Sequence, residues 1–158
     1  MKDSSIVVYT DGSCNPEHGI GAWATILFIG EEKTVLVGKA NQTTHQRMEL
    51  TAVIKAFEYL AKVNLMSLPV RVFTDSQYVV GIPGRSVRLK KNMFNTNKGV
   101  VISNEDLVQQ LIGHSDKYKP TFIKVRAHQY HDKQNVNHEV DKLSRKLVRE
   151  AVDLIIKK

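Results

Sequence analysis

Three apolar segments near the N-terminus have the composition of β-strands. They cover Ser5–Thr10, Gly21–Ile29 and Thr34–Ala40, are rich in β-branched and aromatic residues, and are separated by glycine, proline and charged turns. Because the connections between them are short, we expect neighbouring strands to run antiparallel. The beginning of the chain therefore predicts a three-stranded meander.

The rest of the chain alternates between helical and strand-like patterns. The expected elements are a helix over Gln46–Ala61, a strand over Val70–Thr74, a short helix over Ser76–Val80 that Gly81, Pro83 and Gly84 end, a helix from Ser103 or Asn104 to Ser115, a strand over Thr121–Arg126, and a helix over Val136–Ile156 with a buried stripe of Val140, Leu143, Leu147, Ala151 and Leu154. Strands followed by helical crossovers predict an α/β fold, with helices on both faces of one mixed sheet.

Length and composition indicate a single domain over residues 1–158. The chain has 158 residues, 42% of them hydrophobic, which suffices for one core and is little for two. No apolar run is long enough to span a membrane, and the N-terminus lacks the pattern of an export signal. The only cysteine, Cys14, has no partner in the chain for a disulfide. We therefore expect a cytoplasmic protein.

The balance of charge favours a polyanionic partner. The formal net charge is +7 and the sequence pI is about 9.5. Between Ser76 and Asn104 there is no Asp or Glu, and the segment Arg85–Lys98, called here the basic segment, holds Arg85, Arg88, Lys90, Lys91 and Lys98. A run of like charge is most often a solvated face, so the basic segment gains meaning only beside a site.

Two aspartates follow similar strand-like segments. Asp11 comes after Val-Tyr-Thr and Asp75 after Val-Phe-Thr. Since α/β sheets bind ligands at the carboxyl ends of their strands, we expect both side chains there, and they converge if the two strands are parallel neighbours. Taken singly, each aspartate is more often a turn initiator.

Two further acids lie on or beside the apolar stripes of predicted helices. Glu49 lies on the stripe that faces the sheet, where a carboxylate is costly unless it is paired or binds a metal. Asp141 follows Val140 in the expected first turn of the last helix, where an acid that complements the helix dipole is an equally good interpretation. Four acids at one edge repel each other unless a cation lies among them, and Mg²⁺ prefers oxygen ligands. The set favours a two-metal phosphodiesterase site, with ions about 3.5 to 4 Å apart.

Together these motifs resemble the type 1 ribonuclease H family over essentially the whole chain. The resemblance rests on the segments YTDGSCNP from Tyr9, RMEL from Arg47, TDSQYV from Thr74, Ala127-His128, and NHEVDKL from Asn137. It implies a five-stranded mixed sheet whose first three strands are antiparallel. It also implies four catalytic, metal-binding carboxylates: Asp11, Glu49, Asp75 and Asp141.

The resemblance implies further residues with roles in the reaction. His128 corresponds to a mobile histidine that assists proton transfer or product release, although Ala127 stands where the family commonly has Gly and the loop before Asp141 is longer. The implied substrate-binding residues are Gly12, Asn15 and Gln77 for the RNA minor groove, His45 and Gln46 where the family often has Asn, Thr44 and Asn104 for a DNA phosphate, and Arg85, Arg88, Lys90 and Lys91 of the basic segment.

The implied function is hydrolysis of the RNA strand of an RNA–DNA hybrid, leaving 5′-phosphate and 3′-hydroxyl ends. Two Mg²⁺ ions, with Mn²⁺ as an alternative, would activate the water and support the leaving oxygen. We expect a monomer that needs no protein partner and no membrane, and the start at Met1 without a polymerase domain favours a free-standing enzyme. Two alternatives stay open: a DNA nuclease of the same fold, and a non-catalytic hybrid-binding module, which would lack at least one of the four acids.

Overall fold

A five-stranded mixed sheet forms the centre of the molecule. The computed structural model describes residues 5–65, 67–126 and 135–157. Its strands are β1 (Ile6–Asn15), β2 (Ile20–Ile29), β3 (Glu32–Ala40), β4 (Val70–Thr74) and β5 (Thr121–Lys124), in the order β3-β2-β1-β4-β5. β1, β2 and β3 pair antiparallel, whereas β4 and β5 join in parallel with β1. The predicted sheet is confirmed.

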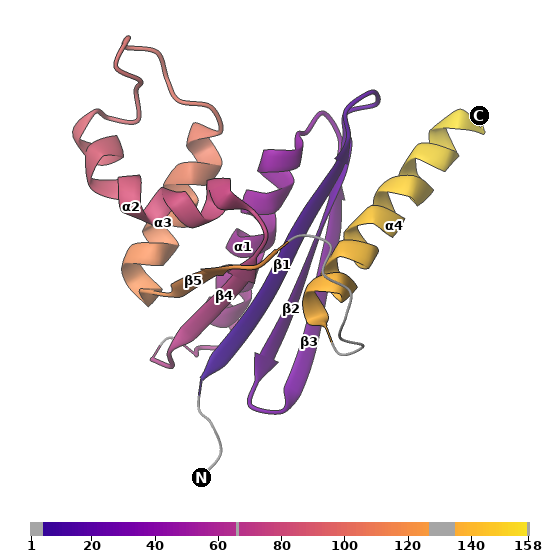
Figure 1. Ribbon diagram of the computed structural model, residues 1–158, viewed down its shortest axis with the longest axis horizontal. Coiled ribbons are helices and arrows are strands. Elements are labelled where there is room, and N and C mark those ends of the chain that lie inside the picture. The colour runs from indigo at the N-terminus through magenta and orange to yellow at the C-terminus, as the bar shows by residue number, and fades with distance from the viewer. Residues whose placement is uncertain (1–4, 66, 127–134, 158) are drawn as a thin grey trace.

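Helices cover both faces of this sheet (Figure 1). They are α1 (His45–Lys62), α2 (Gln77–Lys91), α3 (Glu105–Tyr118) and α4 (Val136–Ile156). Because side chains alternate along a strand, β1 and β2 supply both layers. Val8 and Leu27 pack with α1, whereas Ala24 and Ile26 pack with Val140 of α4.

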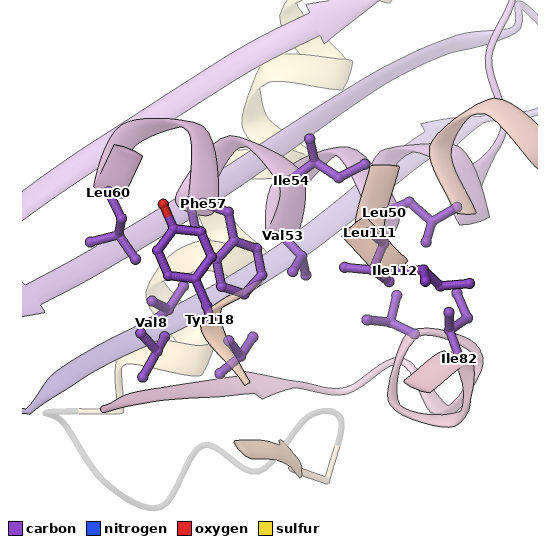
Figure 2. Close-up of a cluster of buried hydrophobic side chains, with 14 of the residues drawn as sticks. Val8, Leu50, Val53, Ile54, Phe57, Leu60, Ile82, Leu111, Ile112 and Tyr118 are labelled. Atoms are coloured by element: carbon purple, nitrogen blue, oxygen red, sulfur yellow. The ribbon is translucent and has the colours of Figure 1, made fainter. Parts of the chain in front are cut away.

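The larger core lies between the sheet and α1 (Figure 2). Phe57 of α1 is fully buried there and stacks on Tyr118 of α3, with the ring centroids 5.1 Å apart. Burying a large apolar side chain contributes about 1.5 to 3 kcal/mol, so this layer fixes α1 firmly against β1. That attachment matters for the site, because α1 carries Glu49.

Helix α2 is longer than the sequence predicts. Gly81, Pro83 and Gly84 were expected to end it, but the helix continues through them to Lys91. Its buried residues are Val79, Ile82 and Leu89, which recur at helical spacing against the larger core. Their burial outweighs the low helix propensity of glycine and the carbonyl that Pro83 leaves without an intrahelical donor.

The buried stripe of α4 also differs from the prediction. The fully covered positions are Val140, Ser144, Val148 and Val152, whereas Leu143, Leu147 and Ala151 are half-buried beside them. Leu154, predicted to be buried, is 64% exposed. Figure 1 shows the reason, because the C-terminal end of α4 diverges from the strands of the sheet.

None of the described helices combines the length and the apolar composition that a bilayer crossing requires.

Candidate active site

Asp11 and Asp75 lie side by side at the centre of the sheet. The parallel pairing of β1 with β4 ends where Tyr9 faces Phe73, and these two rings stack with centroids 4.9 Å apart. Asp75 follows the last residue of β4. We expected Asp11 to end its strand as well. It does not, because β2 pairs with β1 as far as Asn15. Asp11 lies instead just beyond the last residue of β1 that pairs with β4.

Three carboxylates converge at this point. Asp11, Glu49 and Asp75 each offer an oxygen that lies within 4.8 Å of the other two. Glu49 comes from the buried face of α1 and is only 8% exposed. We call these three residues the carboxylate cluster. They line a hollow of about 430 Å³, whose other lining residues are Gly12, Ser13, Cys14, His45, Asp141 and Arg145.

The electrostatics of the cluster favour a cation. Burial raises the pKa of Asp11 to about 9, and the neighbouring carboxylates of Asp75 and Asp141 add to the effect. Burial likewise raises the pKa of Asp75, with the charge of Glu49 as the next cause. Burial and mutual repulsion both oppose the ionisation of these carboxylates. A divalent cation prefers oxygen ligands, and its charge would offset both costs.

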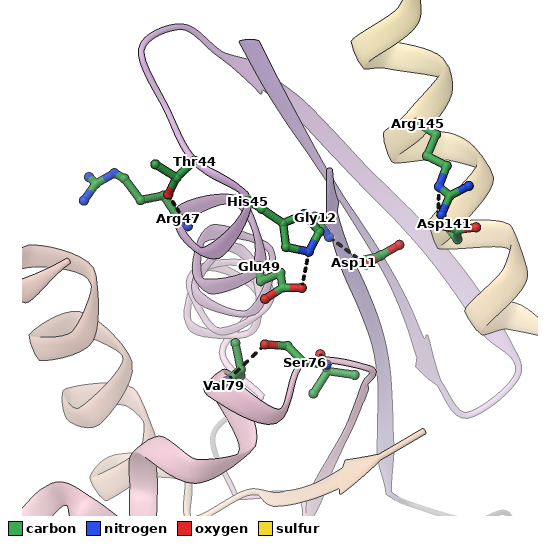
Figure 3. Close-up of polar contacts among 11 residues, drawn as sticks. Asp11, Gly12, Thr44, His45, Arg47, Glu49, Ser76, Val79, Asp141 and Arg145 are labelled. Carbon is green, nitrogen blue, oxygen red and sulfur yellow. Dashed lines mark hydrogen bonds and ion pairs between the residues drawn. The ribbon is translucent and has the colours of Figure 1, made fainter. Parts of the chain in front are cut away.

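Asp141 joins the hollow from the opposite side of β1 (Figure 3). It lies in the second turn of α4, since the helix begins at Val136, and not in the first turn as expected. Its Oδ1 forms an ion pair with Arg145 Nε, and the two atoms are 2.9 Å apart. An acid that only complements the helix dipole would have no reason to share a hollow with three other carboxylates.

A second basic side chain borders the cluster on α1. His45 Nε2 lies 2.7 Å from Glu49 Oε1, and this hydrogen bond raises the pKa of the imidazole. The two pairs, His45–Glu49 and Asp141–Arg145, are each four residues apart on a helix, so each pair lies on one helical face. Of the two basic partners in these pairs, the sequence analysis placed His45 at the site and missed Arg145, although the four-residue spacing was present in the sequence.

Gly12 allows α1 to approach β1. A Cβ atom built at this position would lie 2.4 Å from the backbone nitrogen of Glu49 and 2.5 Å from the carbonyl carbon of Met48. No side chain fits there, since both atoms belong to the backbone of α1. The prediction gave Gly12 a role in RNA contact, and the structure gives it a separate role in packing.

We expect Gly12→Ala to destabilise the fold by about 3 kcal/mol or more, because the helix carrying Glu49 must move off the sheet. Urea unfolding measures the change. Gly81→Ala is the control: nothing lies within 4 Å of its added Cβ, and alanine in a helix is worth about 1 kcal/mol over glycine. A Gly12→Ala variant as stable as the parent would contradict this interpretation.

The predicted phosphate contacts gather at the start of α1. Thr44 caps the helix through its hydroxyl, which accepts from the backbone nitrogen of Arg47 at 3.2 Å. The Asn104 amide lies 3.4 Å from Gln46 Oε1 and 3.2 Å from the Tyr78 hydroxyl. Asn104 precedes α3 as expected, but its side chain makes these contacts in place of a cap.

Two neighbours of this group were missed. Arg47 forms a two-fold ion pair with Asp106, at 3.0 and 2.8 Å, which joins α1 to α3 and lowers the pKa of Asp106 to about 2. Tyr78 has the guanidinium of Arg85 over its ring, 5.9 Å from the centroid. The first pair joins segments far apart in the chain, whereas the second lies within α2.

The remaining predicted residues occupy different places. Asn15 ends β1 and accepts from the backbone nitrogen of His18, and Gln77 begins α2 behind the cap Ser76; neither lines the hollow. Arg88 and Lys91 are exposed near the end of α2, whereas Lys90 pairs with Asp116 of α3. His128 lies outside the described residues.

The fold and the site define a class: α/β proteins in which a mixed sheet and its helices gather carboxylates suited to divalent cations. Within that class, the family model for RNase H matches residues 3–149. The chain belongs to the RNase H family.

Relatives and solved structures agree. The chain is 35% identical to the ribonuclease H of Thiobacillus denitrificans over 152 residues, which is 96% of this chain and 98% of that protein. It is 34% identical to the ribonuclease H of Dechloromonas aromatica, over 94% of this chain and 96% of that protein.

Two solved structures share the fold at 22% identity. One is LC9-RNase H1, a type 1 RNase H with the type 2 active-site motif, which matches with a TM-score of 0.78 over 95% of this chain and 74% of that chain. The other is the foamy viral protease-reverse transcriptase in complex with RNA/DNA hybrid, which matches with a TM-score of 0.73 over 91% of this chain and 20% of that chain.

Proposed function

We propose that this chain hydrolyses the RNA strand of RNA–DNA hybrids at the hollow lined by the carboxylate cluster. The observation that carries the proposal is the meeting of Asp11, Glu49 and Asp75 within 4.8 Å in a member of the RNase H family. Asp141 is proposed as the fourth acid. A non-catalytic hybrid-binding module was expected to lack at least one of the four acids. All four line one hollow, which favours the enzyme over that alternative.

The four carboxylates would hold two divalent cations, with Mg²⁺ as the expected ion and Mn²⁺ as the alternative. Bound there, such ions activate a water and stabilise charge on the scissile phosphate. Asp11 is central, because its carboxyl interacts with both Asp75 and Asp141. Asp75 and Glu49 would hold a cation with Asp11 on one side of β1, and Asp141 would hold one with Asp11 on the other side. His128 remains proposed for proton transfer or product release.

The substrate is proposed from the surroundings of the cluster. Gln46, Asn104 and Tyr78 form a connected polar group near Thr44, suited to a backbone phosphate, and the exposed cations of α2 extend it. A hybrid offers the phosphates of its DNA strand to this polar group and to the cations of α2. Its RNA strand offers 2′-hydroxyls to the residues around the carboxylate cluster. We also propose a cytoplasmic monomer that acts without a protein partner.

The deciding experiment compares three duplexes of one sequence. Labelled RNA–DNA, DNA–DNA and RNA–RNA are incubated with the protein and Mg²⁺, or with chelator. We expect cutting of the RNA strand of the hybrid alone, with 5′-phosphate ends, and none with chelator. Cutting of DNA–DNA would support the DNA nuclease, and binding without cutting would support the hybrid-binding module.

The basic segment gives a separate prediction. Replacing Arg88 and Lys91 together by Gln removes two exposed cations, so the slope of log affinity against log salt falls by about 1.5 to 2 for the hybrid. Fluorescence anisotropy at several salt concentrations measures it. Gln at Lys62 and Lys119, which are exposed elsewhere, is the matched control and leaves the slope unchanged. Equal slopes for both double variants would remove the basic segment from the binding surface.

A further inference from the structure

His45 places a nitrogen donor beside the carboxylate cluster. It begins α1, its Nε2 lies 2.7 Å from Glu49 Oε1, and it lines the same hollow as Asp11 and Asp75 (Figure 3). Its side chain is 60% exposed, whereas that of Glu49 is 9% exposed. The imidazole is therefore held at the mouth of the hollow and not packed into the core.

Stability alone does not account for this contact. Pairs four residues apart on a helix contribute only about 0.3 to 0.5 kcal/mol when exposed, and here the Glu49 carboxylate also bears the cost of burial. Within the described part of the chain, no second hydrogen bond reaches the Glu49 carboxylate. The contact thus keeps an imidazole nitrogen beside this carboxylate, where both groups can reach one cation.

The spacing of the two atoms suits shared coordination. Two neighbouring ligands of a six-coordinate ion, each at about 2.1 Å, are about 3.0 Å apart. The observed 2.7 Å between nitrogen and oxygen is close to that separation. His45 lies at the edge of the carboxylate cluster and not within it, so the ring must swing inward when an ion binds, and its exposure permits the movement.

We propose that His45 supplies an imidazole ligand to the cation held by Glu49, so that this position favours first-row transition ions over Mg²⁺. The inference rests on the carboxylate site proposed above. Imidazole nitrogen binds transition ions well, whereas Mg²⁺ selects oxygen.

The other side of the hollow differs. Asp141 is paired with the guanidinium of Arg145, which has no lone pair to donate to a metal. Among the described residues that line the hollow, Asp11 and Asp141 would therefore offer carboxylate oxygens to the cation position on this side, which suits hard ions. The two cation positions are then chemically inequivalent, and the one near Glu49 discriminates between Mn²⁺ and Mg²⁺.

The test detects the nitrogen directly. Mn²⁺ is added below one equivalent to the full chain without nucleic acid, and electron spin echo envelope modulation reports ¹⁴N coupled to the ion. We expect this coupling in the parent chain and in His18→Asn, an exposed control, and its loss in His45→Asn. In calorimetric titrations, His45→Asn weakens Mn²⁺ binding about tenfold or more and changes Mg²⁺ binding little.

The outcomes separate the two proposals. Mn²⁺ that binds without ¹⁴N coupling, or with coupling that persists in His45→Asn, overturns the role of His45 and leaves the carboxylate site intact. Mn²⁺ binding that is unaffected by Asp75→Asn overturns the carboxylate site itself, and the role of His45 with it. Circular dichroism of each variant confirms that the fold is retained.

Discussion

Asp75→Asn abolishes Mg²⁺-dependent cleavage of the hybrid, by about 10³-fold or more, while the protein stays folded. Asp75 follows β4 directly and is one of the three carboxylates that meet within 4.8 Å. An amide keeps the shape of the side chain but removes the charge that holds a divalent ion. A loss of 10³-fold corresponds to about 4 kcal/mol of transition-state stabilisation.

Initial rates on a labelled hybrid at saturating Mg²⁺ measure the loss, and thermal unfolding in chelator measures the fold. Because burial and the charge of Glu49 raise the pKa of Asp75, the metal-free variant is at least as stable as the parent. Asp153→Asn, an exposed change on α4, is the control and retains full activity. Strong Mg²⁺-dependent cutting by Asp75→Asn would refute the assignment of the site.

The sheet could be predicted because its signals are local. Alternating and continuous apolar runs mark the strands, and the matching segments before Asp11 and Asp75 placed each acid after a strand-like run. That the two strands are parallel neighbours was only a condition of the prediction, and the structure meets it. The stack of Tyr9 on Phe73 follows from the same alternation. Local patterns suffice where each element obeys its own period.

The differences arise where tertiary contacts overrule local preference. Helix α2 passes through Gly81 and Pro83 because Val79, Ile82 and Leu89 are buried against the core, which no single segment reveals. β1 continues beyond Asp11 because β2 remains paired with it. In each case the partner lies elsewhere in the chain.

The polar surroundings of the site show the same limit. Gln46, Tyr78 and Asn104 come from three separate elements, and their contact depends on how α1, α2 and α3 pack. The four-residue spacing of Asp141 and Arg145, by contrast, was readable from the sequence. An ion pair on one helical turn is common on any surface, so the spacing had no weight until the carboxylate cluster was placed beside it.

Without metal, the protein loses stability as the pH rises from about 4 to about 9, and Asp11→Asn removes much of that loss. Burial and the nearby acids disfavour the charge of Asp11, which raises its pKa in the folded protein from the ordinary 3.8 to about 9. Over this range the folded state retains a proton that the unfolded state releases, so unfolding becomes easier with rising pH. Each pKa unit is worth about 1.4 kcal/mol, which makes the total several kcal/mol.

Thermal unfolding in chelator at pH 4 and pH 8 measures the effect. We expect Asp11→Asn to unfold at a similar temperature to the parent at pH 4 and about 5 to 10 °C above it at pH 8. Added Mg²⁺ stabilises the parent at pH 8 more than the variant, since the ion binds the charged carboxylate and replaces the proton.

Asp106→Asn is the control for this prediction, because the pKa of Asp106 is shifted downward whereas that of Asp11 is shifted upward. Arg47 lowers the pKa of Asp106 to about 2, so its contribution to stability is complete above the unfolded pKa and is lost only as the pH falls toward 2. Between pH 4 and 9 this variant should therefore follow the slope of the parent. An Asp11→Asn variant whose slope also equals that of the parent would mean that Asp11 ionises freely, and the crowding of charge that calls for a cation would then be absent.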